Sequence, residues 1–121
     1  MGISACLGPG LVRYSQYGNN GVTMQIIAKA TLRAFWEREP RAETPLVNWY
    51  AAVSRANFSG PADVKAMFGT TVDFVGDNRV IFDIGGNKYR LIVHFAYPYR
   101  RGLIKFVGTH KEYDKINPET I

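Results

Sequence analysis

The chain has 121 residues, the length of one ordinary domain. It is 46% hydrophobic and 21% charged, a balance that excludes intrinsic disorder for most of its length. The single cysteine, Cys6, excludes an intrachain disulfide framework and a thiolate zinc site, and it indicates a cytoplasmic protein. No apolar run approaches the roughly 18 residues of a membrane helix, so we expect no membrane partner. The net charge of +5 indicates an anionic partner without naming it.

The first 23 residues differ from the rest of the chain. They hold five of the twelve glycines, a single basic residue and no acidic residue, and they show no regular period. We expect Met24 to be the natural start, with 1–23 as a flexible N-terminal extension and 24–121 as the folded domain. The alternative is that residues 1–23 form a genuine N-terminal arm.

From Met24 onward the hydrophobic pattern predicts regular elements. Apolar residues recur at helical spacing, as in Leu32, Phe35 and Trp36. Thr44 is expected to cap the second helix, with Pro45 at its first position. The expected elements are, in chain order, a strand at 24–28, helices at about 30–39, 44–56 and 61–67, strands at 79–84, 88–97 and 103–107, and a short helix near 110–116.

The strands and their turns predict an α+β sandwich. Gly85-Gly86-Asn87 and Pro98–Gly102 are turn signals, so the three strands around them form an antiparallel meander. Val72–Val75 adds a short strand or an extended lead-in. The layout is β-α-α-β-β-β, with the N-terminal helices packed on one face of a small antiparallel sheet. The other face is then free to meet solvent or a ligand.

One long stretch, from Ile84 to Lys111, contains no acidic residue. Its cationic and histidine side chains are Lys88, Arg90, His94, Arg100, Arg101, Lys105, His110 and Lys111. Strand alternation assigns one set of side chains to the free face, namely Lys88, Arg90, Ile92 and His94, followed by Leu103, Lys105 and Val107. The alternate residues Tyr89, Leu91, Val93 and Phe95 are expected in the core.

This basic face, interleaved with Tyr97 and Tyr99, is suited to a phosphodiester backbone. The planar fork of arginine can donate two hydrogen bonds to one phosphate. The alternative reading is a basic face that is merely solvated.

Polar side chains also gather where the last strand ends, in Gly108–Asp114. His110 and Tyr113 share a face of a helical turn, and Asp114 could orient the imidazole. A histidine can act as a general acid or base near neutrality. Each residue also has a structural reading, with His110 as a surface or capping residue and Tyr113 as a ring packed on the sheet. Two histidines without a thiolate are poor material for a metal site, and no spacing suggests a cofactor.

Several segments match one family together. Two motifs are specific in combination, GNKYRL at 86–91 and VGTHKEYDKI at 107–116. Shorter matches are Met24–Ile27, Thr31–Trp36, Pro61–Lys65 and Phe74–Phe82. On these residues the chain, from 24 to about 116, resembles the HigB family of toxins from type II toxin–antitoxin modules. Residues 1–23 match nothing in that family.

The resemblance implies a RelE-like fold and an mRNA interferase. Such an enzyme cuts mRNA on translating ribosomes, by metal-independent attack of a ribose 2′-OH, and is silenced by a HigA-type helix-turn-helix antitoxin. The catalytic candidates are Arg90, His110 and Tyr113. The candidates for RNA and phosphate contact are Lys88, Lys105, Lys111, Arg100 and Arg101. RelE-type sites are built mainly from Lys, Arg and Tyr, so the general base stays open between His110 and Tyr113.

Two other classes of function compete with this reading. The first is a non-catalytic nucleic-acid-binding domain that uses the same basic face. The second is a structural or interaction protein whose basic surface is incidental. Steep salt dependence of RNA binding would argue against the second class.

Overall fold

The computed structural model describes residues 22–121. The predicted extension at 1–23 therefore lies almost wholly outside the described residues. The described helices and strands are, in chain order, β2 (Gln25–Ile27), α1 (Lys29–Arg38), α2 (Glu43–Ser54), α3 (Pro61–Phe68), β3 (Val72–Val75), β4 (Arg79–Ile84), β5 (Tyr89–Ala96), β6 (Arg101–Thr109) and α4 (His110–Tyr113). Between residues 22 and 121, no helix is both long enough and apolar enough to cross a bilayer.

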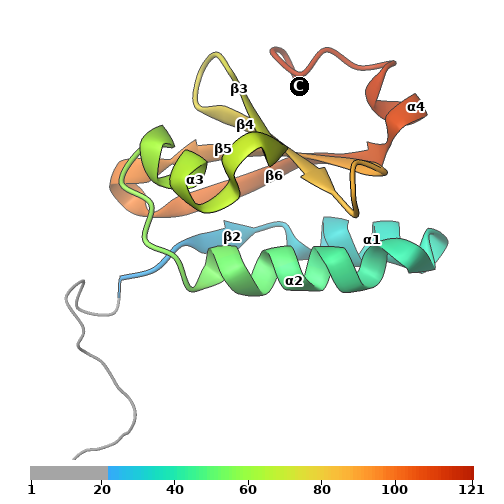
Figure 1. Ribbon diagram of the computed structural model, residues 1–121, viewed down its shortest axis with the longest axis horizontal. Coiled ribbons are helices and arrows are strands. Elements are labelled where there is room, and N and C mark those ends of the chain that lie inside the picture. Colours follow the sequence, from blue (N-terminus) through green and yellow to red (C-terminus); the bar gives the residue numbers. More distant parts are fainter. Residues whose placement is uncertain (1–21) are drawn as a thin grey trace, which may run out of the picture.

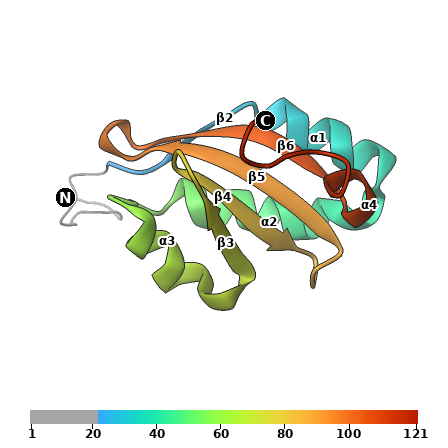
Figure 2. The same cartoon turned by 90° about the horizontal axis from the view of Figure 1, so that it is seen from above.

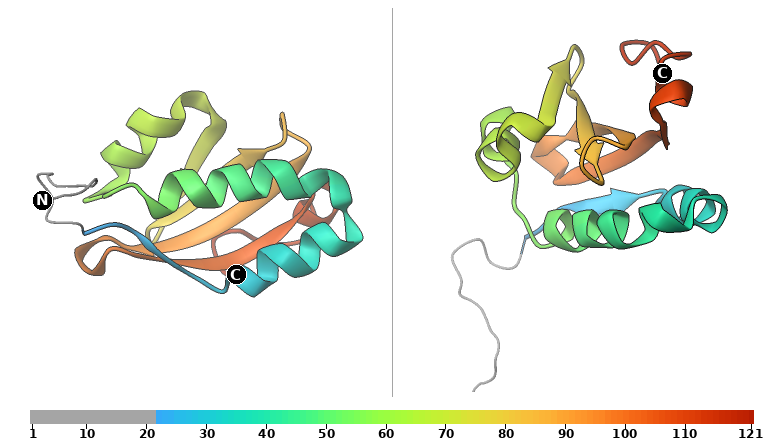
Figure 3. Two further views of the ribbon diagram at one scale, coloured as in Figure 1. Left: turned by 90° about the horizontal axis from the view of Figure 1, so that it is seen from below. Right: turned by 45° about the vertical axis from the view of Figure 1, so that its right-hand side comes forward.

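The fold has two layers, a sheet and a pair of helices. The described strands form one five-stranded sheet in the order β2-β6-β5-β4-β3, and α1 and α2 lie side by side on one of its faces (Figures 1 and 3). α3 closes one end of the core, where the Phe68 ring meets the Phe82 ring edge-on with centroids 4.9 Å apart. The predicted α+β class, with N-terminal helices on one sheet face, is confirmed.

The sheet is mixed, whereas the sequence predicted an antiparallel one. β2 runs parallel to β6, and Ile26 pairs with Gly102. A Cβ atom at Gly102 would lie 3.0 Å from the Phe95 ring and 3.2 Å from Ile26, so glycine leaves room for this packing. The two strands are far apart in the chain, and local periodicity carries no signal for their pairing.

The core lies between the sheet and the two long helices. Leu32 of α1 and Leu46 of α2 are fully buried, as is Leu91 of β5. The Trp49 and Phe82 rings meet edge-on across the layers, with centroids 5.3 Å apart. Burying each large apolar side chain contributes about 1.5–3 kcal/mol. The apolar side chains of the two helices and the sheet therefore hold the two layers together.

α2 begins earlier than predicted, and Thr44 does not cap it. A 3-10 turn at Pro40–Ala42 leads into the helix, and Ala42 holds the N-cap position without a side-chain cap. Thr44 and Pro45 lie within the first turn. Proline is tolerated there because the first N–H groups of a helix have no helical partner.

β6 contains a bulge that changes which side chains face the core. The pairing of β5 with β6 shifts between Ile92 and Val93, which leaves Lys105 as an extra residue. Val107 therefore points into the core and is 9% exposed. The prediction that Val107 shares a face with Leu103 and Lys105 was wrong, because alternation is lost at a bulge.

We call the sheet face opposite α1 and α2 the outer face. Ile81 and Ile92 alternate with core residues and point toward this face, yet they are only 4% and 0% exposed. α4 and the C-terminal residues lie on the same side (Figures 1 and 2). The Nε–H of Arg79 donates a hydrogen bond to the carbonyl oxygen of Ile121 over 3.0 Å. The sequence predicted that this whole face is open to solvent or a ligand. That prediction was wrong at the centre of the face, where Ile81 and Ile92 are buried.

Candidate functional site

The end of β6 turns directly into α4, which mounts His110 and Tyr113. Thr109 is the N-cap, and its Oγ1 accepts a hydrogen bond from the Glu112 backbone N–H over 3.3 Å. In return, Oε1 of Glu112 accepts one from the Thr109 N–H over 2.9 Å. This capping box satisfies two N–H groups that would otherwise have no partner. The expected C-terminal helix is thus present, although it ends at Tyr113.

The structure brings Arg90 and Tyr113 together. Arg90 pairs with Gly108 across the β5–β6 ladder, next to the start of α4. Its guanidinium carbon lies 5.7 Å from the centre of the Tyr113 ring, within the range of a cation–π contact. The same ring lies 6.4 Å from the Phe106 ring, centroid to centroid. A cation, a phenol and the half-buried His110 therefore share one end of the sheet.

Arg90 also has an acidic neighbour that the sequence did not indicate. Nη1 of Arg90 lies 3.2 Å from Oδ1 of Asp83, its partner in the β4–β5 ladder. The two side chains are 14% and 26% exposed. This Nη1 group is buried and makes no hydrogen bond of good geometry, so the contact is an ion pair only.

Burial and nearby charges act on the Tyr113 phenol in opposite directions. Burial raises the pKa of Tyr113, the positive charge of Arg90 lowers it, and the carboxylates of Asp73, Asp114 and Asp83 raise it further. Burial is the largest effect, so the pKa lies above its ordinary value near 10. Tyr113 is therefore a neutral hydrogen-bond donor at physiological pH.

Acidic residues reach the outer face as well, which the charge pattern along the chain did not predict. Oδ2 of Asp77 lies 3.1 Å from Nη1 of Arg79 and 3.8 Å from Nε2 of His94. Asp83 pairs with Arg90 as described. The acid-free stretch of sequence thus lies beside β4 and the turn before it, and Asp83 and Asp77 of these two segments supply its counter-charges.

The basic candidates for RNA contact fall into two groups. Lys88, in the β4–β5 turn, and Lys111, on α4, are exposed at the same end of the sheet as Tyr113. Lys105 is half-buried at the bulge. Arg100 and Arg101 lie at the other end of β6, and eight residues of strand span roughly 25 Å.

Arg100 and Arg101 differ in their surroundings. Arg100 donates hydrogen bonds to the Asn57 side chain and, over 2.6 Å, to the carbonyl oxygen of Tyr97. Arg101 is exposed. Tyr97, expected beside the charges, is buried and stacks on Phe95 with centroids 5.4 Å apart, so that expectation was wrong. Tyr99 is 74% exposed, as expected.

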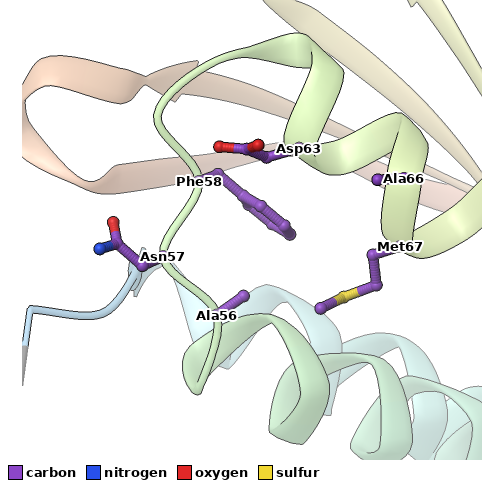
Figure 4. A pocket seen from close by; sticks show the side chains of 6 residues that line it. All are labelled: Ala56, Asn57, Phe58, Asp63, Ala66 and Met67. Atoms are coloured by element: carbon purple, nitrogen blue, oxygen red, sulfur yellow. The ribbon is translucent and has the colours of Figure 1, made fainter. Parts of the chain in front are cut away.

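A separate pocket of about 430 Å³ lies at this far end (Figure 4). Ala66 and Met67 of α3 line one side, and the segment Ala56–Phe58 lines the other. Its charged residue, Asp63, already accepts hydrogen bonds from the backbone N–H and hydroxyl of Ser59, over 2.8 and 2.7 Å. The charged residue of the pocket is therefore already hydrogen-bonded within its own loop. Among the described residues, no three His, Cys, Asp or Glu side chains gather as metal ligands.

Sequence reasoning missed two residues at the site, Asp83 and Glu112. Thr109-x-x-Glu112 is a readable capping-box pattern, so the role of Glu112 had a signal. Asp83 had none, because its contact with Arg90 depends on the register between two strands.

Comparison with known proteins identifies a family to which this chain is similar. The model of "HigB_toxin, RelE-like toxic component of a toxin-antitoxin system" matches residues 42–116. The chain is 29% identical over 94 residues to the mRNA interferase HigB of Escherichia coli O6:H1 (strain CFT073), which covers 77% of this chain and 91% of that protein. It is 30% identical over 92 residues to the mRNA interferase toxin HigB of Escherichia coli (strain K12) and to the mRNA interferase HigB of Shigella flexneri. Each of these alignments covers 75% of this chain and 88% of the relative.

Proposed function

Because the chain belongs to the HigB family of RelE-like toxins from toxin–antitoxin systems, we propose that it is an endoribonuclease that cleaves messenger RNA. The relatives named mRNA interferase, matched over three quarters of the chain, support this activity. A toxin of this class implies an antitoxin partner. In our proposal that antitoxin is of the HigA helix-turn-helix type, the mRNA is cut on translating ribosomes, and the protein acts in the cytoplasm.

The observation that carries the proposed site is the contact of Arg90 with Tyr113 at the α4 end of the sheet, 5.7 Å from guanidinium carbon to ring centre. Arg90 supplies positive charge for a phosphate. Tyr113 supplies a neutral O–H donor, and His110 on the same turn supplies an imidazole, a group that can serve as a general acid or base. Lys88 and Lys111, exposed at the same end, extend the positive charge along the RNA backbone.

The proposed reaction needs one base and one acid. The base removes the proton of a ribose 2′-OH, and the 2′-oxygen forms a bond to the adjacent phosphorus. The bond from phosphorus to the 5′-oxygen breaks, and the acid protonates that oxygen. The products are a 2′,3′-cyclic phosphate and a 5′-hydroxyl. We assign the base to His110 and the acid to Tyr113, since a raised pKa keeps the phenol protonated.

Three single substitutions test this site: Arg90→Ala, His110→Ala and Tyr113→Ala. Each should relieve growth arrest on expression and reduce mRNA cleavage on ribosomes by about 10²–10⁴-fold. Arg41→Ala, an exposed arginine of the 3-10 turn before α2, is the matched control and should keep full toxicity. Circular dichroism would verify that all four variants fold.

A second test concerns the substrate. A single 2′-deoxy nucleotide on the 5′ side of the scissile phosphate should block cleavage, because the attacking oxygen is absent. Full toxicity of all three site variants would show that the site is elsewhere. RNA binding without any cleavage by the wild type would favour the non-catalytic alternative.

A further inference from the structure

An ion pair joins α1 to α4 around the edge of β6. Nη2 of Arg38, in the last turn of α1, lies 2.9 and 3.2 Å from the two carboxylate oxygens of Glu112. The end of α1 and α4 lie beside each other at this edge (Figure 2). The residues are 74 positions apart in the chain, so the contact fixes one element against another rather than shaping a single turn.

Arg38 and Glu112 each make a further contact within their own part of the fold. The Arg38 guanidinium carbon lies 4.7 Å above the centre of the Phe35 ring, which is buried in the core. Glu112 accepts the Thr109 N–H bond that closes the capping box. That N–H bond, together with the Arg38 guanidinium, lowers the pKa of Glu112, so the carboxylate is ionised at neutral pH. The ion pair therefore connects the core, through Arg38, to the cap of α4.

α4 depends on such outside support. It has four residues, and a helix this short is not stable in isolation. Its other contacts are the capping box, the Phe106–Tyr113 ring contact, the contact of the Tyr113 ring with Arg90 of β5, and the hydrogen bond from the Asp114 N–H to the His110 carbonyl, 2.9 Å long. These contacts join α4 to the sheet or lie within α4 and the residue after it. Among the hydrogen bonds and ion pairs of residues 22–121, the Arg38–Glu112 contact is the one that joins α4 to the helical layer.

We propose that Arg38 is a positioning residue for RNA cleavage, which acts by holding Glu112, and with it α4, so that His110 and Tyr113 stay beside Arg90. This inference rests on the proposed function. Arg38 does not touch the candidate reacting groups, so its effect is on the geometry of α4 and on kcat. A misplacement of reacting groups by about 1 Å can lower a rate by up to roughly 100-fold.

The test is a double-mutant cycle on cleavage of an mRNA in translating ribosomes. Arg38→Gln and Glu112→Gln each remove the ion pair, and glutamine at position 112 can still accept the Thr109 N–H. Each should lower kcat by about two- to fivefold, the range that loss of an exposed ion pair allows, and leave KM unchanged. The double variant should be no slower than either single variant, because both remove the same interaction. Arg38→Lys should restore part of kcat, and Arg33→Gln, an exposed arginine of the same helix, should match the wild type.

Amide hydrogen exchange tests the same contact without any activity. In Arg38→Gln, the amides of Thr109, Glu112 and Asp114 should exchange about two- to fivefold faster, the range expected for an exposed ion pair. The core amides of Leu91 and Val93 should be unchanged, which separates a local effect from general destabilisation.

The possible outcomes separate the two proposals. An unchanged kcat in Arg38→Gln, with an active wild type, overturns the positioning role and leaves the proposed function intact. Additive losses in the double variant also overturn it, since Arg38 would then act by another route. An inactive wild type overturns the proposed function itself, and the exchange data would still show whether Arg38 fixes α4.

Discussion

The guanidinium carbon of Arg90 lies 5.7 Å from the centre of the Tyr113 ring, so a strand residue and a residue of the terminal helical turn orient each other. Burial keeps the pKa of Tyr113 above its ordinary value, against the opposing charge of Arg90. The phenol is therefore protonated at neutral pH, the form in which it can donate a hydrogen bond or a proton.

The first prediction concerns the pH dependence of cleavage. Tyr113→Phe should lower the rate by about 10²–10³-fold, because a preorganised donor is lost, while the shape of the pH–rate profile between pH 6 and 9 stays the same. Cleavage by the wild type and by Tyr113→Phe across this range is the measurement. A wild-type rate that climbs toward pH 9 and loses that climb in Tyr113→Phe would identify a phenolate base and contradict the assignment.

The second prediction separates two neighbouring arginines that the charge pattern had grouped together. Arg101 is exposed, so Arg101→Ala should weaken RNA binding and reduce the slope of log K against log salt by about 0.7, the value for one phosphate contact on a single strand. Arg100 binds the Asn57 side chain and the Tyr97 carbonyl. Arg100→Ala should therefore lower the free energy of unfolding by about 1–3 kcal/mol.

The controls for this pair are reciprocal. Arg101→Ala should leave the free energy of unfolding unchanged, and Arg100→Ala should leave the salt slope unchanged. Residue 100 has a φ of 54° in the structure, and alanine meets the same backbone strain there as arginine. The loss of free energy of unfolding in Arg100→Ala therefore measures the hydrogen bonds of the side chain. If the two variants exchanged these effects, the described surroundings of the arginines would be incorrect.

Local patterns predicted the elements well where the signal lies within one segment. The bounds of β4, 79–84, follow from its run of β-branched and aromatic residues. The turn Gly85-Gly86-Asn87 has positive φ at all three residues, which is the conformation that glycine and asparagine tolerate best. The apolar stripe through Leu32 and Phe35 is buried as predicted.

Relations between distant segments could not be predicted in this way. The parallel pairing of β2 with β6 joins the first and last described strands, and the bulge at Lys105 reverses the facing of Val107. The Asp83–Arg90 ion pair depends on register, and Arg38–Glu112 depends on how α1 passes the edge of β6. The sequence therefore indicated Arg90, His110 and Tyr113 of the candidate site, but not the acidic residues Asp83 and Glu112 that lie against Arg90 and Arg38.

The third prediction concerns Tyr97, whose hydroxyl is buried without a hydrogen-bond partner. Burial raises the pKa of Tyr97 to about 12. The folded state therefore resists deprotonation of Tyr97, and the contribution of this residue to the free energy of unfolding is constant below pH 10 and is lost as the pH rises through 12. Tyr97→Phe removes an unpaired polar group while keeping the ring, so the free energy of unfolding at pH 7 should stay the same or rise by about 1 kcal/mol.

Chemical denaturation at pH 7 and at pH 10.5–11.5 measures both parts of this prediction. The alkaline loss of stability should be smaller in Tyr97→Phe than in the wild type. A loss of more than about 1 kcal/mol at pH 7 would mean that the hydroxyl has a partner in solution.

The last prediction concerns Gly108, which lies between Phe106 and the carboxylate that caps α4. A Cβ atom at Gly108 would lie 2.6 Å from Cζ of Phe106 and 2.9 Å from Oε1 of Glu112. Glu112 cannot retreat without giving up its bond to the Thr109 N–H, so α4 has to move. Gly108→Ala should lower the free energy of unfolding by about 1–3 kcal/mol and reduce mRNA cleavage at least tenfold. Gly76→Ala is the matched control, since a Cβ atom there meets nothing within 4 Å.

A second variant separates the two close contacts at Gly108. Phe106→Leu in the Gly108→Ala background relieves the ring contact and leaves the contact with Glu112. Stability should then recover in part, while cleavage stays low, because the cap of α4 is still displaced. Recovery of both would assign the effect to Phe106, and unaltered stability and cleavage in Gly108→Ala alone would contradict the described packing of α4 on β6.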